Sequence, residues 1–531
     1  MAIAGALGLA AEGRAQLNDH GRQTWEPGEC CAIPVETELF FGNATAIGDF
    51  NEDGFQDLAI GVPGATLIGG QHAGKVVVLP GTETGPSMVG LVVLDETDLG
   101  GEVGIDERFG SALAVGDFNG DGADDLAIGV PGDDNDGGAA AGGVYTILGR
   151  DAATGGSGMF GDQEPRYWSY ATVSVGGWAD PHDRFGESLA SGDFDGDGFD
   201  DLVIGVPFDN VEAGLDNAGS LTLLRGTTTA FGLTPFHGIT LDCGSPSVPC
   251  DLSSGATFAW ALAGGDFDGN GTDDLAIGIP GQAVGEVDFV GAVIVLEFDN
   301  PGTGLEIVDS EYRYQGSGIP GAPEAFDYHG WTLAAGDFDG DGADDLVVGA
   351  PSEGVGTNDW AGAFAVLEGV LGSGIEVNGA LWTQDDLGGQ ESREGESLAA
   401  ALAVGDFDAD GFDDLVLGAP GEERLLLGPG GLGWYETGAI LVVPGSAAGL
   451  ALAAAQTWVG TPGDLSPGDG FGLSLATGRL RGGSDSLAIG SVVWDTGAHF
   501  QVGRVSVLFS DHLFSDGFET GDATAWSAVT P

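Results

Sequence analysis

One acidic, glycine-rich pattern recurs six times along the chain and constrains its fold more than any other feature. In one copy, Asp193-Phe194-Asp195-Gly196-Asp197-Gly198-Phe199-Asp200-Asp201, aspartates stand at positions 1, 3, 5 and 9 of a nine-residue loop. The copies begin at Asp49, Asp117, Asp193, Asp266, Asp337 and Asp406, so neighbouring copies lie 68 to 76 residues apart. A period this regular indicates one supersecondary unit that has been duplicated.

Each loop offers the oxygen donors that a calcium ion prefers. Side-chain oxygens at positions 1, 3, 5 and 9 and a backbone carbonyl at position 7 can surround one hard cation, and glycine at position 6 permits the sharp turn. The sequence therefore predicts about six calcium sites with a structural role. The expected ligands are Asp49, Asn51, Asp53, Phe55 and Asp57; Asp117, Asn119, Asp121, Ala123 and Asp125; Asp193, Asp195, Asp197, Phe199 and Asp201; Asp266, Asp268, Asn270, Thr272 and Asp274; Asp337, Asp339, Asp341, Ala343 and Asp345; and Asp406, Asp408, Asp410, Phe412 and Asp414.

Three loops carry an asparagine in place of one carboxylate, at Asn51, Asn119 and Asn270. Ligand charge tunes calcium affinity. We therefore expect these loops to bind calcium more weakly than the four-carboxylate loops that begin at positions 193, 337 and 406.

The apolar patterning around each loop predicts four short strands per unit. A first strand opens at an aromatic-glycine pair such as Phe109-Gly110, the loop follows, and a second strand of the type Asp125 to Pro131 ends at Gly-x-Pro. Four short strands in about seventy residues are typical of a propeller blade. A seventh unit opens at Phe471-Gly472, but residues 479–484 have lost the acidic positions, so we expect it to bind no calcium.

A ring of blades needs a partner for the last blade's edge, because an unpaired edge strand invites aggregation. Gln23-Thr24-Trp25 precedes the first aromatic-glycine pair much as Gln456-Thr457-Trp458 precedes the last one. The predicted fold is all-β: a seven-bladed propeller of four-stranded antiparallel blades, closed by an N-terminal strand near residues 20–28 that pairs with residues 502–509. Expected boundaries are a shortened signal segment at 1–15, the propeller at 16–510 with blades starting near 41, 109, 185, 258, 329, 398 and 471, and a tail at 511–531.

Three motifs in register, namely Phe-Gly, the Asp-x-Asp-x-Asp-Gly-x-x-Asp-Leu loop and Gly-Ala-Pro (349–351 and 418–420), resemble the FG-GAP repeat family. That family includes the integrin α-chain head and secreted bacterial proteins. The resemblance covers residues 41–510 and implies a seven-bladed propeller with calcium in loops on one face. The pair departs from the pattern at Phe258-Ala259, His329-Gly330 and Leu398-Ala399, and nothing matches the integrin inserted or leg domains.

The charge limits the classes of partner that the protein can bind, and the cysteine content indicates its compartment. Fourteen basic and 83 acidic residues give a formal net charge of −69, which repels nucleic acid and anionic membranes. Four cysteines, at 30, 31, 243 and 250, allow three pairings, of which Cys243 with Cys250 is our first choice because they bracket a short loop. A disulfide suits an extracellular or cell-surface setting. The longest uncharged run, 437–457, aligns with a strand and a turn of the first repeat, so no transmembrane segment is expected.

The residues favour a binding or adhesion scaffold over an enzyme. There is no H-E-x-x-H, G-x-S-x-G or phosphate-loop motif, and the histidines at 20, 72, 182, 237, 329, 499 and 512 are scattered. We expect a monomer whose ligand is a protein or a carbohydrate, held on the face opposite the loops. Alternatives are a secreted polysaccharide hydrolase or lyase that uses paired acids, and a purely structural envelope protein. Candidate ligand-face residues are Trp178, His182, Arg184, Trp360, Trp434 and Tyr435.

Overall fold

The computed structural model describes most of the chain between residues 22 and 509. The described ranges are 22–31, 33–134, 140–150, 158–161, 163–173, 180–211, 215–229, 231–243, 245–250, 253–299, 305–376, 380–388, 390–428, 431–459, 470–481, 485–492 and 501–509. The expected signal segment at 1–15 and tail at 511–531 lie outside them.

Seven antiparallel blades are arranged in a ring, as the sequence predicts. Blade 1 comprises β2 (Thr45–Gly48), β3 (Asp57–Val62), β4 (Lys75–Leu79) and β5 (Val92–Leu94), and blade 2 comprises β6 (Leu113–Gly116), β7 (Asp125–Val130), β8 (Gly143–Ile147) and β9 (Arg166–Trp168). Blade 3 comprises β10 (Ser188–Gly192), β11 (Asp201–Val206), β12 (Ser220–Gly226) and β13 (Leu233–Leu241). Blade 4 comprises β14 (Ala261–Gly265), β15 (Asp274–Ile279), β16 (Ala292–Asp299) and β17 (Glu306–Gln315), with β18 (Gly318–Ile319) at its edge.

The remaining blades keep the same order and carry two additions. Blade 5 comprises β19 (Thr332–Gly336), β20 (Asp345–Ala350) and β21 (Ala363–Val370), which pairs with both β22 (Gly374–Glu376) and β23 (Leu381–Thr383). Blade 6 comprises β24 (Leu402–Gly405), β25 (Asp414–Ala419), β28 (Ala439–Val443) and β29 (Gln456–Trp458), with a hairpin of β26 (Glu423–Gly428) and β27 (Gly431–Glu436) inserted. Short helices are α1 (Pro27–Cys30), α2 (Tyr170–Val173), η1 (Glu96–Leu99), η3 (Gln384–Asp386) and η4 (Leu452–Ala454).

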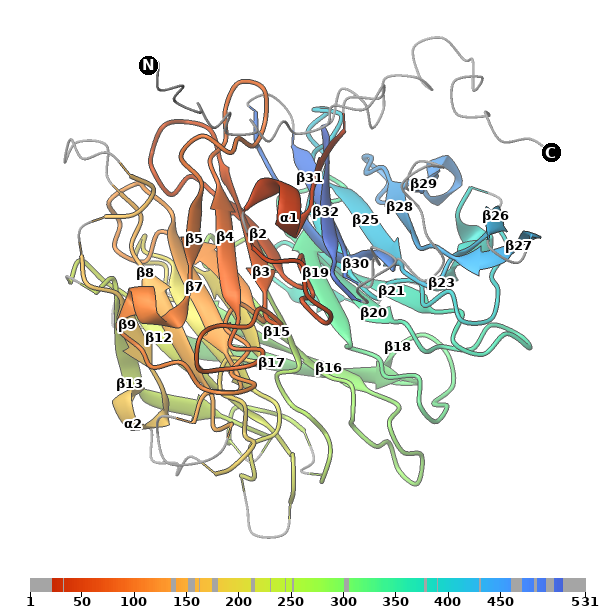
Figure 1. Cartoon of the computed structure of the whole chain (residues 1–531). Coiled ribbons are helices and arrows are strands. Elements are labelled where there is room, and N and C mark those ends of the chain that lie inside the picture. The colour runs from red at the N-terminus through yellow and green to blue at the C-terminus, as the bar shows by residue number, and fades with distance from the viewer. Residues whose placement is uncertain are drawn as a thin grey trace, which may run out of the picture.

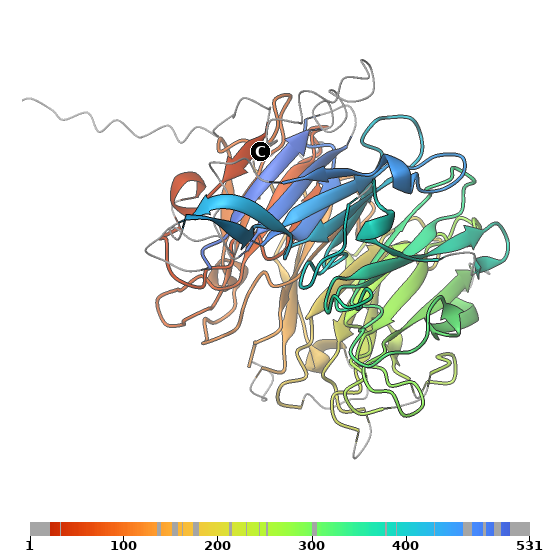
Figure 2. The same cartoon turned by 90° about the vertical axis from the view of Figure 1, so that its right-hand side faces the viewer.

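Blade 7 is completed by the N-terminal strand. It comprises β30 (Phe471–Gly478), β31 (Ser486–Ser491), β32 (Arg504–Phe509) and β1 (Gln23–Trp25), which pairs antiparallel with β32 so that Thr24 lies opposite Ser506. Both views show the red start of the chain beside the blue strands of its end (Figures 1 and 2). The predicted closure is confirmed.

In blades 1 to 6 the pair at the aromatic-glycine position lies three or four residues before the first strand, so the prediction that it opens that strand is wrong there, whereas β30 of blade 7 does begin at Phe471. Phe109 instead forms a parallel bridge with Gly74, which precedes β4 of the previous blade. The same bridge joins Phe41 to Gly503, Phe185 to Gly142, His329 to Gly291, Leu398 to Gly362 and Phe471 to Gly438. Each pair thus attaches a blade to its neighbour.

The hydrophobic core lies between successive blades. Phe50, at loop position 2 of blade 1, packs in one cluster with Val76 of its own blade and Leu126 and Ile128 of blade 2. The equivalent phenylalanines at 118, 194, 267, 338 and 407 are also buried. Full burial of one such ring contributes about 1.5–3 kcal/mol. Blade-to-blade packing therefore holds the ring together and fixes the loops on one face.

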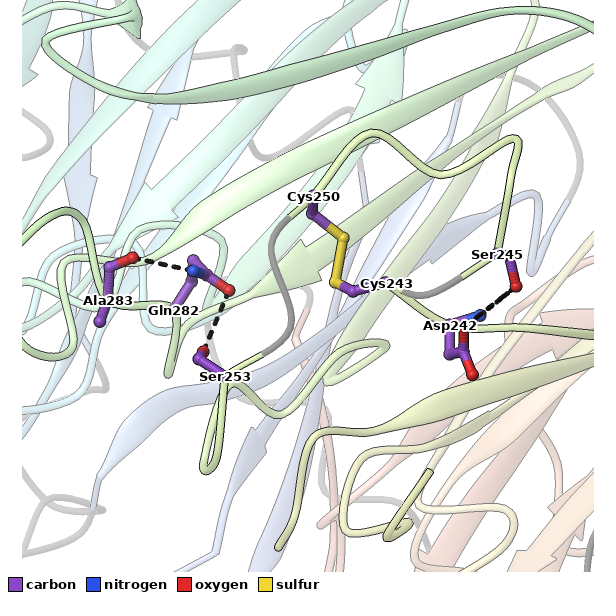
Figure 3. The surroundings of a disulfide bond; sticks show 7 residues. All are labelled: Asp242, Cys243, Ser245, Cys250, Ser253, Gln282 and Ala283. Atoms are coloured by element: carbon purple, nitrogen blue, oxygen red, sulfur yellow. Dashed lines mark hydrogen bonds between the residues drawn. A yellow bond between two sulfur atoms is a disulfide. The ribbon is translucent and has the colours of Figure 1, made fainter. Parts of the chain in front are cut away.

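Cys243 and Cys250 form a disulfide with a Cα–Cα distance of 5.1 Å, so the expected local pairing is confirmed (Figure 3). It closes the segment that follows β13. Cys30 and Cys31 are also joined to each other.

Candidate functional site

The six acidic loops fold around their first aspartate. In blade 1, Asp49 accepts hydrogen bonds from the backbone amides of Asp53 and Gly54 at 3.0 and 2.9 Å. The side chain at position 5 then accepts one from the amide of position 7, as Asp53 does from Phe55 at 3.0 Å. All six loops repeat this second contact at 2.7–3.2 Å: Ala123 to Asp121, Phe199 to Asp197, Thr272 to Asn270, Ala343 to Asp341 and Phe412 to Asp410 complete the set. The local sequence therefore shapes each loop by itself.

The aspartate at position 9 begins the second strand and is buried in all six blades that carry an acidic loop. Asp57 accepts hydrogen bonds from the amides of Phe50 at 3.1 Å and Gly81 at 2.8 Å. Burial raises its pKa to about 7, although both amides act to lower it. Burial likewise raises the pKa to about 8 for Asp125, Asp201 and Asp274, and to about 7 for Asp345 and Asp414. A nearby cation would oppose this shift by favouring the ionised form.

At least three of the described loops bring one oxygen from each of three carboxylates within 4.8 Å of one another. These groups are Asp193, Asp195 and Asp197; Asp266, Asp268 and Asp274; and Asp337, Asp339 and Asp341. In blade 1, by contrast, the amide nitrogen of Asn51 donates to Asp57 at 3.2 Å. Carboxylate, carboxamide and carbonyl oxygens are the donors that calcium takes. The donor set of the loops therefore fits this ion.

One loop already contains a positive charge. Arg225, at the end of β12, pairs through its guanidinium with Asp195 and Asp197, at loop positions 3 and 5. The corresponding strand position in blades 4 and 5 carries Glu297 and Glu368, whose charges act on Asp274 and Asp345 respectively. The loops thus differ in charge in a way that the loop sequences alone do not show.

A residue that sequence reasoning missed links each loop to the next. The aspartate just before position 9 accepts a hydrogen bond from the amide of position 1 in the preceding blade, as Asp124 does from Asp49 at 2.7 Å. Equivalent bonds of 2.8–3.1 Å join Asp200 to Asp117, Asp273 to Asp193, Asp344 to Asp266, Asp413 to Asp337 and Asp485 to Asp406. Gln56 accepts from Arg479 and completes the seven-membered circle. The doubled Asp-Asp at the start of the second strand in blades 2 to 6 was the available signal.

The opposite ends of the strands carry a continuous set of aromatic rings, which we call the aromatic patch: Phe208, Trp260, Trp331, Tyr328, Phe289 and Phe326. Neighbouring ring centroids in this order lie 4.7 to 6.1 Å apart. The rings come from segments that follow second strands or precede first and third strands in blades 3 to 5. The side chain of Phe326 is 53% exposed. The patch therefore offers apolar surface on the face away from the loops.

The candidate ligand-face residues do not all lie at the aromatic patch, and some of them lie outside the described part of the chain. Arg184 lies over the ring of Phe208 at 4.8 Å and so adjoins the aromatic patch. Trp360 is 60% exposed, and His182 also lies in a described turn. Trp178 lies outside the described residues, as do the side chains of Trp434 and Tyr435 on β27.

His329 is not an isolated histidine. It is fully buried in the aromatic-glycine position of blade 5, and its Nε2 lies 3.3 Å from Glu353. Asp327 belongs to the same cluster. The segment before β19 and the turn after β20 of the same blade bring these side chains together, which single-residue spacing could not predict.

The fold and its loops define a class of protein: a seven-bladed propeller built from acidic-loop repeats. The FG-GAP repeat family matches six segments, at residues 41–79, 109–147, 185–224, 258–296, 329–367 and 398–441. The chain therefore belongs to the FG-GAP repeat proteins and has an integrin-α-like propeller.

Sequence relatives agree with this assignment. Integrin alpha pat-2 of Caenorhabditis briggsae is 32% identical over 45% of this chain and 18% of its own length, and integrin alpha-5 of Xenopus laevis is 30% identical over 45% and 20%. A phosphatidylinositol-glycan-specific phospholipase D of Bos taurus is 35% identical over 32% of this chain and 18% of its own length. The chain thus spans about a fifth of the length of these curated relatives. A solved structure named the Dos1 propeller covers 88% of this chain and 77% of its own at 9% identity, with a TM-score of 0.40 that is too low to support an inference.

Among the described residues, no helix is long and apolar enough to cross a membrane.

Proposed function

We propose that the chain is a calcium-binding propeller of the cell exterior that acts as a binding scaffold for a protein or carbohydrate ligand. In this proposal calcium sits in the acidic loops and has a structural role, whereas the aromatic patch on the other face contacts the ligand. The patch is the observation that carries the binding role, because partly exposed, touching aromatic rings are the surface feature that protein loops and sugar rings both use.

Calcium would act through the loops and the circle of bonds between them. Asp195, Asp339 and their neighbours supply ligand oxygens, while the aspartates before position 9 hold neighbouring loops together. A cation that neutralises the first group removes repulsion inside each loop. The expected effect is on stability and on the rigidity of the face, with no calcium-driven change of fold.

Two features support an exterior location. Cys243 and Cys250 form a disulfide of the kind that persists in oxidising compartments. The net charge of −69 keeps the surface solvated and disfavours nucleic acid and anionic lipid as partners. The integrin α relatives favour a scaffold role. We do not transfer the phospholipase activity, because that match covers only 18% of the enzyme.

The test is a screen of glycan and extracellular-protein arrays with and without calcium, repeated with Phe326→Ala. Phe326 is half exposed at the end of the patch, so its loss should leave the fold intact and weaken binding at least tenfold. Val308→Ala, an equally exposed apolar site on β17, is the matched control and should bind like the native chain. Binding that Phe326→Ala leaves unchanged would contradict the patch as the ligand surface, and an array without hits would contradict the scaffold role.

A further inference from the structure

The ring contains a second repeated constellation, which we call the upper junction. It combines three positions. The first is at the end of a blade's fourth strand, two residues after the residue that pairs with the second residue beyond the bridging glycine. The second lies two residues before the next blade's aromatic-glycine pair, and the third is the second residue after that blade's Gly-x-Pro. All three lie at the strand ends opposite the acidic loops. They are Glu96, Glu107 and Asp133 between blades 1 and 2; Tyr170, Asp183 and Asp209; Cys243, Ala256 and Gln282; Gln315, Asp327 and Glu353; and Gln384, Glu396 and Glu422 between blades 5 and 6.

In most upper junctions a neutral side chain satisfies or replaces the acids. The amide of Gln384 donates to Glu422 at 2.9 Å, and that of Gln315 donates to Glu353 at 3.3 Å. The junction of blades 3 and 4 has no carboxylate at these positions, and there the amide of Gln282 donates to the carbonyl of Ala283 beside the disulfide (Figure 3). A glutamine at the first position therefore supplies the donor that a paired carboxylate needs.

The junction of blades 1 and 2 has three carboxylates and no such amide. Glu96, Glu107 and Asp133 are 0%, 2% and 1% exposed, and one oxygen from each lies within 4.8 Å of the others. Tyr145 donates to Oε1 of Glu96 at 3.0 Å, and the backbone amide of Gly104 bonds to Glu107.

The second oxygens of both glutamates lack a donor. Oε2 of Glu96 and Oε2 of Glu107 are buried and receive no hydrogen bond from a backbone amide, hydroxyl or amide side chain of the described residues, and the two carboxyl groups face each other closely enough to share a proton. A buried carboxylate oxygen without a partner is costly, and three ionised carboxylates this close repel one another. The cluster therefore needs a positive species that the described side chains do not supply to these two oxygens.

We propose that Glu96, Glu107 and Asp133 bind a divalent cation of the calcium type, at a site separate from the acidic loops and on the opposite end of the strands. Buried carboxylate oxygens are hard donors, and an ion of charge +2 reduces the cluster's charge from −3 to −1. The site would join η1 of blade 1 to two segments of blade 2, the one before β6 and the one after β7. The alternative species is a proton shared among the acids, and the experiment separates the two.

The measurement is the calcium content of the full chain after equilibrium dialysis, compared between the native chain and Glu96→Gln. This substitution gives the first junction one glutamine and two carboxylates, the combination that the fold already contains at Gln384, Glu396 and Glu422, so the protein should fold. Asp133→Asn is a second variant in case the first one does not. Each should bind one calcium fewer than the native chain. The difference does not depend on how many ions the acidic loops hold.

Glu396→Gln is the matched control, because that junction has one carboxylate fewer and Gln384 already donates to Glu422 there. It should keep the native calcium content. Terbium gives a local readout: an ion beside Tyr145 should show tyrosine-sensitised emission that Glu96→Gln lowers and Glu396→Gln does not. Unchanged calcium content in Glu96→Gln and Asp133→Asn would overturn the proposal and leave protons as the counter-charge.

Discussion

The carboxylate of Asp200 in blade 3 accepts a hydrogen bond of 2.8 Å from the backbone amide of Asp117 in blade 2. The amide of Asp200 returns a bond of 3.2 Å to the carbonyl of Asp117. This reciprocal pair recurs at each blade junction around the loop face, with Gln56 and Arg479 in the same roles where the ring closes. The loops are thus one connected circle.

Removal of one link should destabilise the whole ring. Asp200→Ala leaves the amide of Asp117 without its acceptor, and an unsatisfied part-buried amide costs about 1–3 kcal/mol. Asp200→Asn keeps an acceptor oxygen and should cost less. Chemical denaturation of both variants checks this, and equal stability of Asp200→Ala and the native chain would refute the linking role.

Arg225 should compete with calcium in blade 3. Its guanidinium pairs with Asp195 and Asp197, so a calcium ion must displace it or share these oxygens. Arg225→Gln should therefore raise calcium affinity at this loop, which a calcium titration would register as one tighter site. Arg313→Gln, which removes a pair with Glu311 outside the loops, is the control and should leave the titration unchanged.

The metal-free protein should lose stability as pH rises. The position 9 aspartates have folded-state pKa values raised to about 7 or 8, above the ordinary value of 3.8, because burial favours the neutral acid. The folded state then binds more protons than the unfolded state between about pH 4 and pH 8. Their contribution to stability is therefore complete below pH 4 and is lost as pH rises through the folded pKa values.

Calcium should reverse this trend, since it binds the ionised carboxylates. The rise in melting temperature on calcium addition should be larger at pH 8 than at pH 5. Melting curves at both pH values, with chelator and with calcium, measure it. A calcium effect that is greater at pH 5 would contradict the expected ligands.

Closure by β1 should be needed for full stability. Trp25 is 2% exposed and packs with Val505 and Val507 of β32, so Trp25→Ala should cost about 3–5 kcal/mol. Deletion of residues 1–20, which leaves β1 in place, is the control and should have little effect. A melting temperature that Trp25→Ala does not change would count against a stabilising role of β1.

The sequence predicts those features that a single unit encodes. The loop at 193–201 and its siblings, the strand that follows each loop, the degenerate seventh loop near Arg479 and the pairing of Thr24 with β32 all follow from motifs in register. Features that arise between blades were missed. Asp124 accepts from a loop 75 residues away, and Glu96 joins Glu107 and Asp133 only when two blades pack. The sequence of one repeat does not show which residues of the neighbouring blade lie close to it. Within blade 3, the approach of Arg225 on the third strand to the loop of its own blade was also missed.

The central claim is that calcium in the acidic loops stabilises the propeller. The most direct measurement is the melting temperature of the full chain after chelation with EGTA and after return of calcium. A single site at a free calcium concentration 100 times its Kd adds about 2.7 kcal/mol. We predict a fall of several degrees on chelation that calcium restores. A melting temperature unchanged by chelator, with no calcium bound after dialysis, would contradict the account.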